Sequence, residues 1–306
     1  MKALQYTAYG VRPVVTEIHR PEPGPGEVLV EIAGAALNPL DVKIGHGLVK
    51  DFFPVTFPSV VGTDLAGTVV RLGPGVTGPR VGDAVLARTD PTAGGAVAEY
   101  AAVPVTHLTA APPALPLGLA AGLATAAATA WQAVHEVAGL RPGQRVLIHG
   151  GAGGVGGFAL QLARKAGAHV LTTTSPAGAS LAGKLGAHEV IDYTATDFRE
   201  RASRVDVVID PIGGDVETAS LDVLVPGGLL LALNVPPDAD RAAAHGLRAA
   251  FVHHETDAAR LAKVAAAGLE VVVDRVVPLT DAAAAYDHVA AGHAKGKVVV
   301  QRLPAS

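Results

Sequence analysis

The 306-residue sequence contains no cysteine, which excludes disulfides, thiolate nucleophiles and every zinc site built on cysteine. Charged residues make up only 17% of the chain and aromatic residues only 4%, whereas hydrophobic residues make up 49%. This composition is too apolar for a disordered chain and suits a globular protein with a large buried sheet. We expect two hydrophobic cores, because a single core stops growing at about 250–300 residues.

Basic residues also lack the clustering that nucleic-acid binding requires. The formal net charge is -4, and Lys and Arg form no block or stripe, so we expect no nucleic-acid partner. The N-terminal stretch has no apolar run typical of a secretion signal, and we expect a cytoplasmic protein. Residues 115–134 are uncharged, but the prolines at their start and their Ala, Gly and Thr content favour a buried helix over a membrane span.

The pattern of apolar residues changes along the chain. In the first hundred residues, short apolar strands alternate with turn sequences such as PEPGPG and GPGVTG, which is typical of an antiparallel barrel or sandwich. The expected strands are 3–6, 14–17, 28–36, 60–72 and 83–87. A helical stretch at 117–138 follows, and strands and helices then alternate up to residue 233, which predicts a doubly wound parallel sheet.

The tail is predicted to mix helices with strands. We expect helices at 257–267 and 281–291, a β-rich segment at 270–277 and a final strand at 297–301. The final strand could rejoin the N-terminal module, so that the nucleotide fold is inserted into a discontinuous domain. The predicted domains are therefore 1–115 with 271–306, and 116–270.

The strongest motif is a glycine-rich loop placed directly between a strand and a helix. In RVLIHGGAGGVGG, Gly151, Gly153 and Gly156 match the pattern GxGxxG, which in this context binds a dinucleotide. Gly151 would permit the tight turn, Gly153 would let backbone amides reach the pyrophosphate, and Gly156 would let helix and strand pack closely. The predicted phosphate-binding loop consists of Gly151, Ala152, Gly153, Gly154, Val155 and Gly156.

The next strand of the nucleotide fold indicates the choice of cofactor. It ends in Thr173, Thr174 and Ser175, and no acidic residue occurs at 157–188, where an NAD enzyme would bind the ribose 2'-hydroxyl with Asp or Glu. Hydroxyl groups can instead donate to a 2'-phosphate. Lys184 could add positive charge, or it could be a solvated helix residue. The sequence therefore favours NADPH over NADH.

These stretches together resemble the zinc-independent quinone oxidoreductases, the zeta-crystallin-like branch of the medium-chain dehydrogenase/reductase superfamily. Matching segments extend almost from end to end, among them PEPGPGEVLVEIAGAALNPLDVK, GLRPGQRVLIHGGAGGVG and VPGGLLLAL. Where the zinc alcohol dehydrogenases of the superfamily carry a His-Glu pair, this chain has Thr63 and Asp64. The resemblance implies a Rossmann sheet inserted into a GroES-like, mainly-β barrel domain, with no metal.

The resemblance also implies an activity and an assembly. We expect a zinc-free reductase that transfers hydride from NADPH to a quinone or an α,β-unsaturated carbonyl compound. An enoyl-thioester or alkenal reductase would use the same fold and cofactor, and a cofactor-binding protein with a structural or sensing role and little turnover stays open too. A homodimer is expected through edge strands of the nucleotide domains, for which the apolar strand 228–233 is a candidate.

The catalytic residues that the resemblance implies lie in NPLDVK. Asn38, Asp41 and Lys43 would line the cleft beside the nicotinamide. Lys43 could donate a hydrogen bond to a substrate carbonyl as negative charge develops on its oxygen. It could alternatively contact only the cofactor ribose or solvent.

Further cofactor contacts are implied outside the glycine loop. These residues are Thr129, Tyr193, Asn234, Phe251, Val252 and Lys295. Plain alternatives stay open, since Thr129 could bond its own backbone, Tyr193 could merely pack, and Lys295 could be solvated. His253 or His254 could face the substrate as a proton donor, or could lie at the surface.

Overall fold

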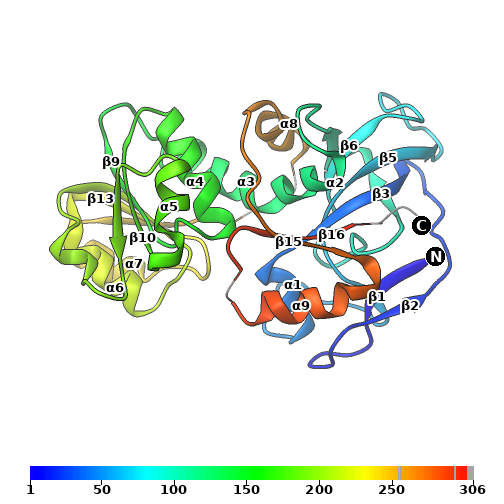
Figure 1. Cartoon of the computed structure of the whole chain (residues 1–306), viewed down its shortest axis with the longest axis horizontal. Coiled ribbons are helices and arrows are strands. Elements are labelled where there is room, and N and C mark those ends of the chain that lie inside the picture. The colour runs from blue at the N-terminus through cyan, green and yellow to red at the C-terminus, as the bar shows by residue number, and fades with distance from the viewer. Residues whose placement is uncertain (254, 256, 293, 302–306) are drawn as a thin grey trace. The chain divides into compact units, whose positions relative to one another are not determined.

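The computed structural model describes residues 1–253, 255, 257–292 and 294–301. The chain forms two compact units, one of residues 1–126 with 255–306 and one of residues 127–254 (Figure 1). The first unit is discontinuous in sequence, since its two segments flank the second unit. Each unit is described separately below.

Short strands build most of the first unit. They are β1 (Lys2–Tyr6), β2 (Val14–Glu17), β3 (Glu27–Leu37), β4 (Ser59–Val60), β5 (Asp64–Leu72), β6 (Ala84–Arg88), β7 (Tyr100–Pro104), β8 (Leu108–Ala110), β15 (Val273–Pro278) and β16 (Lys297–Gln301). Among the described residues, one sheet has the order β15-β16-β3-β5-β6-β8 with β7 also paired to β3, and a second has the order β2-β1-β4. This strand arrangement agrees with the mainly-β domain that the resemblance implied.

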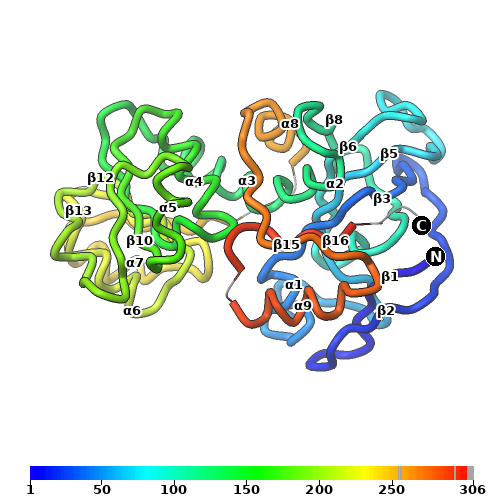
Figure 2. Tube along the Cα trace, in the orientation of Figure 1, coloured from blue at the N-terminus to red at the C-terminus, as the bar shows by residue number. Residues whose placement is uncertain are grey.

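The long strand β3 organises the barrel. It pairs with β5, β7 and β16, and its apolar side chains, such as Leu29 and Val30, are fully buried. The prediction that the final strand rejoins the N-terminal module is confirmed, because β16 runs antiparallel to β3 with Val298 opposite Leu37 (Figure 2). Residues about 260 positions apart in sequence thus become neighbours at one end of β3.

The expected single strand at 60–72 is wrong, because the structure divides it into β4 and β5. Gly62 lies between them with a φ of +88°, a left-handed conformation that ends the extended chain. A Cβ atom at Gly62 would also come within 2.7 Å of Val97 Cγ2. The structure also contains β7, β8 and a short helix, α1 (Pro39–Gly45), which the sequence pattern did not indicate.

Parallel strands and helices alternate in the second unit. The strands are β9 (Arg145–Ile148), β10 (His169–Thr174), β11 (Glu189–Asp192), β12 (Val205–Asp210), β13 (Leu224–Ala232) and β14 (Arg248–Phe251), and the helices between them are α4 (Gly154–Lys165), α5 (Pro176–Lys184), α6 (Asp215–Ser220) and α7 (Ala239–Ala244). The sheet order β11-β10-β9-β12-β13-β14 confirms the doubly wound fold. Helices α4 and α5 cover one face of the sheet, and α6 and α7 cover the other (Figure 1).

The expectation that 228–233 forms a sheet edge is wrong. β13 lies between β12 and β14, with Leu229 paired to Arg248 on one side and to Val207 on the other. Its apolar character reflects burial on both faces of a parallel sheet, since Leu230 and Leu231 are at most 1% exposed. Within the described residues, the edge strands of this sheet are β11 and β14.

The helical stretch Leu117–Val137 is long and apolar enough to cross a membrane by length and composition alone. However, 72% of its most apolar window is buried inside the protein, as in a core helix. The stretch contains α2 (Leu117–Ala120) and α3 (Ala124–Trp131), and the two units meet in sequence within α3.

The observed units begin and end at residues other than the predicted boundaries, which were 115/116 and 270/271. At the first boundary, α2 packs against β3 and β5 of the barrel, so the start of the helical stretch belongs to the first unit. At the second, α8 (Ala258–Ala266) packs against β8 and β6 and joins the same unit. The helix α9 (Ala282–Ala290) follows and contacts β15 and β16.

Candidate functional site

In the barrel unit, the segment NPLDVK forms the junction between β3 and α1. Asn38 has an extended backbone, with φ -128° and ψ 155°, and Pro39 follows as the first helical residue, where its missing N–H costs nothing. Asp41 accepts a hydrogen bond from the backbone N–H of Asn38 at 2.7 Å, which is one half of a capping box. The hydroxyl of Tyr6 donates to the Asp41 carbonyl at 2.6 Å.

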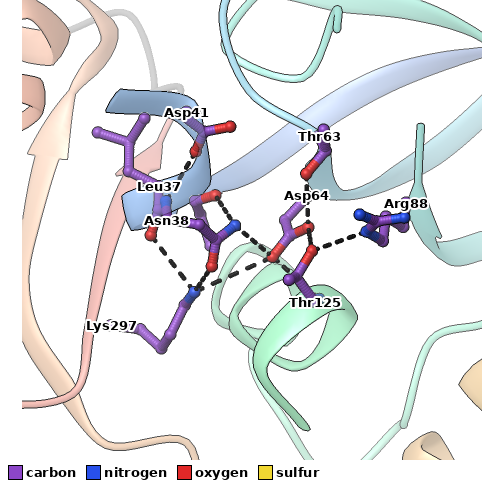
Figure 3. Close-up of polar contacts among 9 residues, drawn as sticks. Leu37, Asn38, Asp41, Thr63, Asp64, Arg88, Thr125 and Lys297 are labelled. Atoms are coloured by element: carbon purple, nitrogen blue, oxygen red, sulfur yellow. Dashed lines mark hydrogen bonds and ion pairs between the residues drawn. The ribbon is translucent and has the colours of Figure 1, made fainter. Parts of the chain in front are cut away.

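The amide side chain of Asn38 is buried and fully engaged (Figure 3). Its Nδ2 donates to Asp64 Oδ2 at 2.9 Å, and its Oδ1 accepts from Lys297 Nζ at 2.5 Å. An ammonium can only donate and a carboxylate can only accept, so these two neighbours fix which way the amide points.

Asp64 stands at the centre of this cluster and has no exposed surface. Its Oδ1 accepts from the hydroxyls of Thr63 and Thr125, at 3.0 and 2.5 Å. Its Oδ2 accepts from Asn38 and from the backbone N–H of Thr125 at 3.0 Å. Both oxygens of the carboxylate are therefore doubly hydrogen-bonded inside the protein (Figure 3).

Lys297 brings a positive charge to the cluster from the C-terminal strand. Its side chain is only 3% exposed, and its Nζ also donates to the Leu37 carbonyl at 3.3 Å and lies 4.0 Å from Asp64 Oδ2. Burial lowers the pKa of Lys297, and the negative charges of Asp64 and Asp41 oppose that effect. The ammonium thus depends on its carboxylate neighbours to stay charged in the interior.

Arg88 adds a second buried cation. Its Nε donates to Thr125 Oγ1 at 2.9 Å, and burial lowers the pKa of Arg88. Burial also raises the pKa of the Asp41 carboxyl to about 7, although the hydrogen bond from Asn38 lowers it. With both carboxylates ionised, the two cations and two anions cancel.

The three predicted catalytic residues therefore differ in their surroundings. Asn38 and Asp41 are buried, with side chains bonded inside the barrel unit, so their geometry suits holding α1 in place. Lys43 is half-buried, and burial lowers its pKa. Of the three, Lys43 is the side chain that combines an ionisable group with access to solvent.

The residues present do not fit a zinc site. The part of the chain that the structure describes contains no group of three or more His, Cys, Asp or Glu side chains that could hold a metal ion. Thr63 and Asp64, which stand where zinc alcohol dehydrogenases carry a ligand pair, are bonded to each other and to neighbouring donors. The Lys297 ammonium, 4.0 Å from Asp64 Oδ2, neutralises this carboxylate.

In the nucleotide unit, the glycine loop is packed too closely for side chains. A Cβ atom at Gly151 would come within 2.2 Å of Thr172 Oγ1, and one at Gly156 would come within 2.2 Å of the Gly150 carbonyl oxygen. Gly153 is the N-cap of α4, whose first amide groups have no partner within the helix. The loop thus leads into a helix N-terminus whose first amide groups lack helical partners, as a phosphate-binding terminus requires, which fits a dinucleotide.

A buried histidine directly before this loop escaped the sequence analysis. His149 is 1% exposed, with Nδ1 3.0 Å from Thr173 Oγ1 and Nε2 2.9 Å from Ser220 Oγ. Ser220 donates its own hydrogen to the Val216 carbonyl at 2.6 Å, so Nε2 must carry the proton that it shares with Ser220. Nδ1 then accepts from Thr173, whose oxygen accepts from the Gly150 N–H at 3.3 Å. Burial lowers the pKa of His149 to about 4, so the ring is neutral at pH 7.

The hydroxyl residues at the end of β10 are not equivalent. Thr173 hydrogen-bonds the ring of His149. Thr174 is 4% exposed and packs against Gly178, where a Cβ atom would come within 2.2 Å of Thr174 Oγ1. Ser175 is the N-cap of α5 and is partly exposed. Among these three, Ser175 is therefore placed best to meet a ligand.

The structure does not bring Lys184 to this point. Lys184 is exposed at the last position of α5, nine residues after Ser175. At about 1.5 Å per residue, the two lie about 13 Å apart along the helix. Lys184 and Ser175 are close in sequence, but the helix between them separates them in space.

Other predicted cofactor contacts follow the strands of the same sheet. Tyr193 comes directly after β11, its N–H donates to the Thr174 carbonyl at 3.3 Å, and its side chain is 60% exposed. Asn234 comes after β13 and donates to the Ile212 carbonyl at 3.1 Å. Asp210, at the end of β12, accepts from the Ile212 N–H at 2.7 Å. These residues lie at the carboxyl edge of the sheet, where such folds bind ligands.

The edge strand β14 carries the next predicted contacts. Phe251 ends the strand and is partly buried, and Val252 is 3% exposed with its N–H donating to the Ala232 carbonyl at 3.0 Å. The carbonyl of His253 accepts from Gln132 Nε2 at 3.1 Å. His254, the other proposed proton donor, lies outside the described residues.

The remaining two predicted contacts come from other elements. Thr129 is 7% exposed within α3. Lys295 belongs to the barrel unit, where its side chain is exposed and its backbone N–H donates to Asp274 at 3.2 Å. The buried lysine of GHAKGK is Lys297, two residues further on, and the sequence analysis did not single it out.

Comparisons with known proteins agree with this architecture. The model for the alcohol dehydrogenase GroES-like domain matches residues 24–113, and the model for zinc-binding dehydrogenases matches residues 185–300. A chloroplast quinone-oxidoreductase homolog from Spinacia oleracea is 31% identical over 323 aligned residues, with 98% of each chain covered. The structure of a quinone oxidoreductase from Coxiella burnetii is 31% identical with a TM-score of 0.90 and 99% of each chain covered. A mycobacterial protein solved in complex with NADPH is 29% identical with a TM-score of 0.87, covering 98% of this chain and 99% of that one.

Proposed function

We propose that this protein reduces quinones or α,β-unsaturated carbonyl compounds with NADPH and without zinc. The chain belongs to the quinone oxidoreductase type of the medium-chain dehydrogenase/reductase superfamily. Family membership makes the chain an oxidoreductase. The observation that carries the proposal is the glycine loop before α4, where side chains at Gly151 and Gly156 would collide with the protein itself. Such a loop at the carboxyl edge of a doubly wound sheet supports dinucleotide binding.

The preference for NADPH rests on the end of β10. Ser175 is a partly exposed helix N-cap, and the stretch 157–188 has no acidic residue to repel a 2'-phosphate. The hydroxyl of Ser175 and the N-terminus of α5 both favour a negative group at this position. When bound, the nicotinamide supplies the hydride, so the chain needs no redox-active side chain of its own.

Lys43 is the proposed catalytic residue. Its ammonium would donate a hydrogen bond to the substrate carbonyl as negative charge builds on the oxygen. The lowered pKa makes this ammonium a stronger acid than an exposed lysine, which suits a group that passes a proton to that oxygen. Quinones, enones and enoyl thioesters all offer such a carbonyl, so the same role serves each acceptor class.

We also propose a homodimer that pairs through β14. The strand is an edge among the described residues, and Ala249, Ala250 and Phe251 are partly buried within one protomer. An apolar edge strand is usually covered, and we propose that β14 of a second protomer covers it here. Light scattering coupled to size exclusion should give twice the mass of 30.8 kDa, and a monomer at micromolar concentration would contradict this part of the proposal.

The first experiment titrates the protein with NADPH and NADH by nucleotide fluorescence, and then adds quinones, enones and enoyl thioesters while nicotinamide absorbance is followed without added metal. We expect tighter binding of NADPH and acceptor-dependent oxidation. Binding of neither nucleotide would overturn the proposal, and binding without oxidation of any acceptor would favour a sensing or structural role.

The cofactor preference has its own test in Ser175→Asp. A carboxylate at this N-cap would repel the 2'-phosphate and accept from the ribose hydroxyl, so NADPH affinity should fall at least about tenfold relative to NADH, or about 1.4 kcal/mol. Ser180→Asp, which places the same charge further along α5, is the control and should leave the ratio unchanged. If the ratio of NADPH affinity to NADH affinity stays unchanged in Ser175→Asp, the 2'-phosphate binds elsewhere.

A further inference from the structure

We propose that Lys297 is a positioning residue for the reductase site, because its buried ammonium fixes the Asn38 amide that holds the start of α1 and, with it, Lys43. The inference rests on the proposed function, since it assigns Lys43 to the substrate carbonyl. The contacts that carry it are the 2.5 Å hydrogen bond from Lys297 Nζ to Asn38 Oδ1 and the second one to the Leu37 carbonyl.

Strand pairing explains how this lysine reaches α1. β16 runs antiparallel to β3, and Val298 lies opposite Leu37, the last residue of β3. Lys297, the first residue of β16, is therefore placed beside Asn38, the residue between β3 and α1. The side chain turns inward toward Asn38 and Asp64 (Figure 3), which is unusual for a lysine unless it is paired.

The ammonium has a specific task at Asn38. Asp64 binds the Nδ2 end of the amide at 2.9 Å, and Lys297 binds the Oδ1 end. Without Lys297, the Oδ1 atom would be a buried acceptor that has lost its charged donor, and Asp64 would lose its nearest ammonium. The amide would then be free to rotate, and the residue that begins α1 would lose its anchor.

Lys43 follows Asn38 by five residues on the same short helix. Because α1 has only seven residues, a shift at its first turn reaches Lys43 within the same helix, although Tyr6 also bonds the Asp41 carbonyl. A displacement of about 1 Å at a catalytic group can cost about a hundredfold in rate. Lys297 thus acts on the reaction through the backbone of α1 and without touching the substrate.

The test compares Lys297→Met and Lys297→Gln with the wild type as full-length protein. Met removes the ammonium at similar length, whereas Gln keeps N–H donors without the charge. We expect kcat with a quinone or enone to fall by about 10- to 100-fold in Lys297→Met, and by less in Lys297→Gln, while the Kd for NADPH stays as in the wild type. Lys263→Met, the same change at an exposed lysine of α8, is the control and should leave kcat unchanged.

A second readout does not depend on turnover. Reductive methylation with ¹³C-formaldehyde labels accessible lysines, and the Lys43 signal, assigned with Lys43→Arg, reports its pKa. Burial lowers the pKa of Lys43 in the wild type, so loosening of α1 in Lys297→Met should raise it toward the ordinary value.

The outcomes separate the two proposals. If the wild type binds NADPH but reduces no acceptor, the proposed function fails while the Lys43 signal still tests the role of Lys297. If the wild type is active and a folded Lys297→Met or Lys297→Gln variant keeps both kcat and the Lys43 pKa, the positioning role is overturned. Should Lys297→Met not fold, Lys297→Gln decides by the same two measurements.

Discussion

The two units hold their functional helices by different means. In the barrel unit, α1 is fixed by a cluster of buried charges, with Asp64 and Lys297 at its centre. In the nucleotide unit, α4 is fixed by glycine packing and by a chain of neutral hydrogen bonds through His149. Burial acts on both in the same sense, since it raises the pKa of Asp41 and lowers the pKa of His149; in each case it disfavours the charged form.

The charge cluster and the neutral hydrogen-bond chain have different requirements. A charge cluster works only while every member is present, because removing one partner leaves the opposite charge buried and uncompensated. A neutral chain loses less from any single deletion, but it depends on one protonation state of the histidine. The barrel should therefore be sensitive to the loss of any one charged side chain, whereas the nucleotide unit should depend on the neutral form of His149.

The largest expected effect comes from Asp64→Ala. This change leaves Lys297 and Arg88 without their central carboxylate, which should destabilise the barrel unit by about 3–5 kcal/mol. Hydrogen exchange of β3 and β5 in increasing urea measures the loss. Asp51→Ala removes an exposed carboxylate and should stay within about 0.5 kcal/mol of the wild type. A loss below about 1 kcal/mol in Asp64→Ala would mean that the charges do not hold the barrel together.

The second prediction concerns pH and the nucleotide unit. Because burial lowers the pKa of His149 from its ordinary value of 6.5 to about 4 in the folded chain, the unfolded chain binds the proton more tightly at intermediate pH. The neutral ring therefore contributes its full share of the free energy of unfolding above pH 6.5. This contribution, about 3 kcal/mol in total, is lost as the pH falls toward 4.

Trp131 measures that loss, since it is the single tryptophan and belongs to the nucleotide unit. Urea unfolding followed by its fluorescence should show the decline between pH 6.5 and 4 in the wild type and a flatter profile in His149→Gln. Equal slopes in the two proteins would mean that His149 is not the group responsible.

Much of this comparison could be read from the sequence, but its decisive contacts could not. The positions of most strands and the glycine loop follow from local patterns, because period and turn residues act over a few positions. The hydrogen bond from Lys297 to Asn38 joins residues 259 positions apart, and that from His149 to Ser220 joins residues 71 apart. No local pattern encodes such pairs.

The errors have the same origin. The run 228–233 is equally apolar at an edge or in the middle of a sheet, and only the position of β14 decides between them. Lys295 and Lys297 stand in one motif and look alike in sequence, yet the side chain of Lys295 is exposed and that of Lys297 is buried. Their difference arises because Lys297 is the first residue of β16, which pairs with β3 beside Asn38, whereas Lys295 lies before the strand.

The third prediction tests the packing at α4. Gly156→Ala would drive a Cβ atom to within 2.2 Å of the Gly150 carbonyl oxygen, so the loop must shift and NADPH should bind at least about tenfold more weakly, or about 1.4 kcal/mol. Gly183→Ala is the matched control, because a Cβ atom there meets nothing within 4 Å and alanine favours the helix. Unchanged affinity in Gly156→Ala would show that the loop tolerates displacement and that glycine packing does not fix it.

The smallest expected effect comes from Ser220→Ala, which removes the acceptor for His149 Nε2–H. A buried donor is left unpaired, which costs about 1–3 kcal/mol, less than the loss in Asp64→Ala because no charge is exposed to the interior. Thr218→Ala on the same helix is the control, since its hydroxyl also bonds a carbonyl four residues earlier but is exposed. The ¹⁵N shifts of His149 give a direct signature, because the ring should carry its proton on Nε2 in the wild type and populate the Nδ1 form in Ser220→Ala. If the wild-type ring is protonated on Nδ1, the neutral chain runs in the opposite direction, with Ser220 donating to Nε2 and Nδ1–H donating to Thr173.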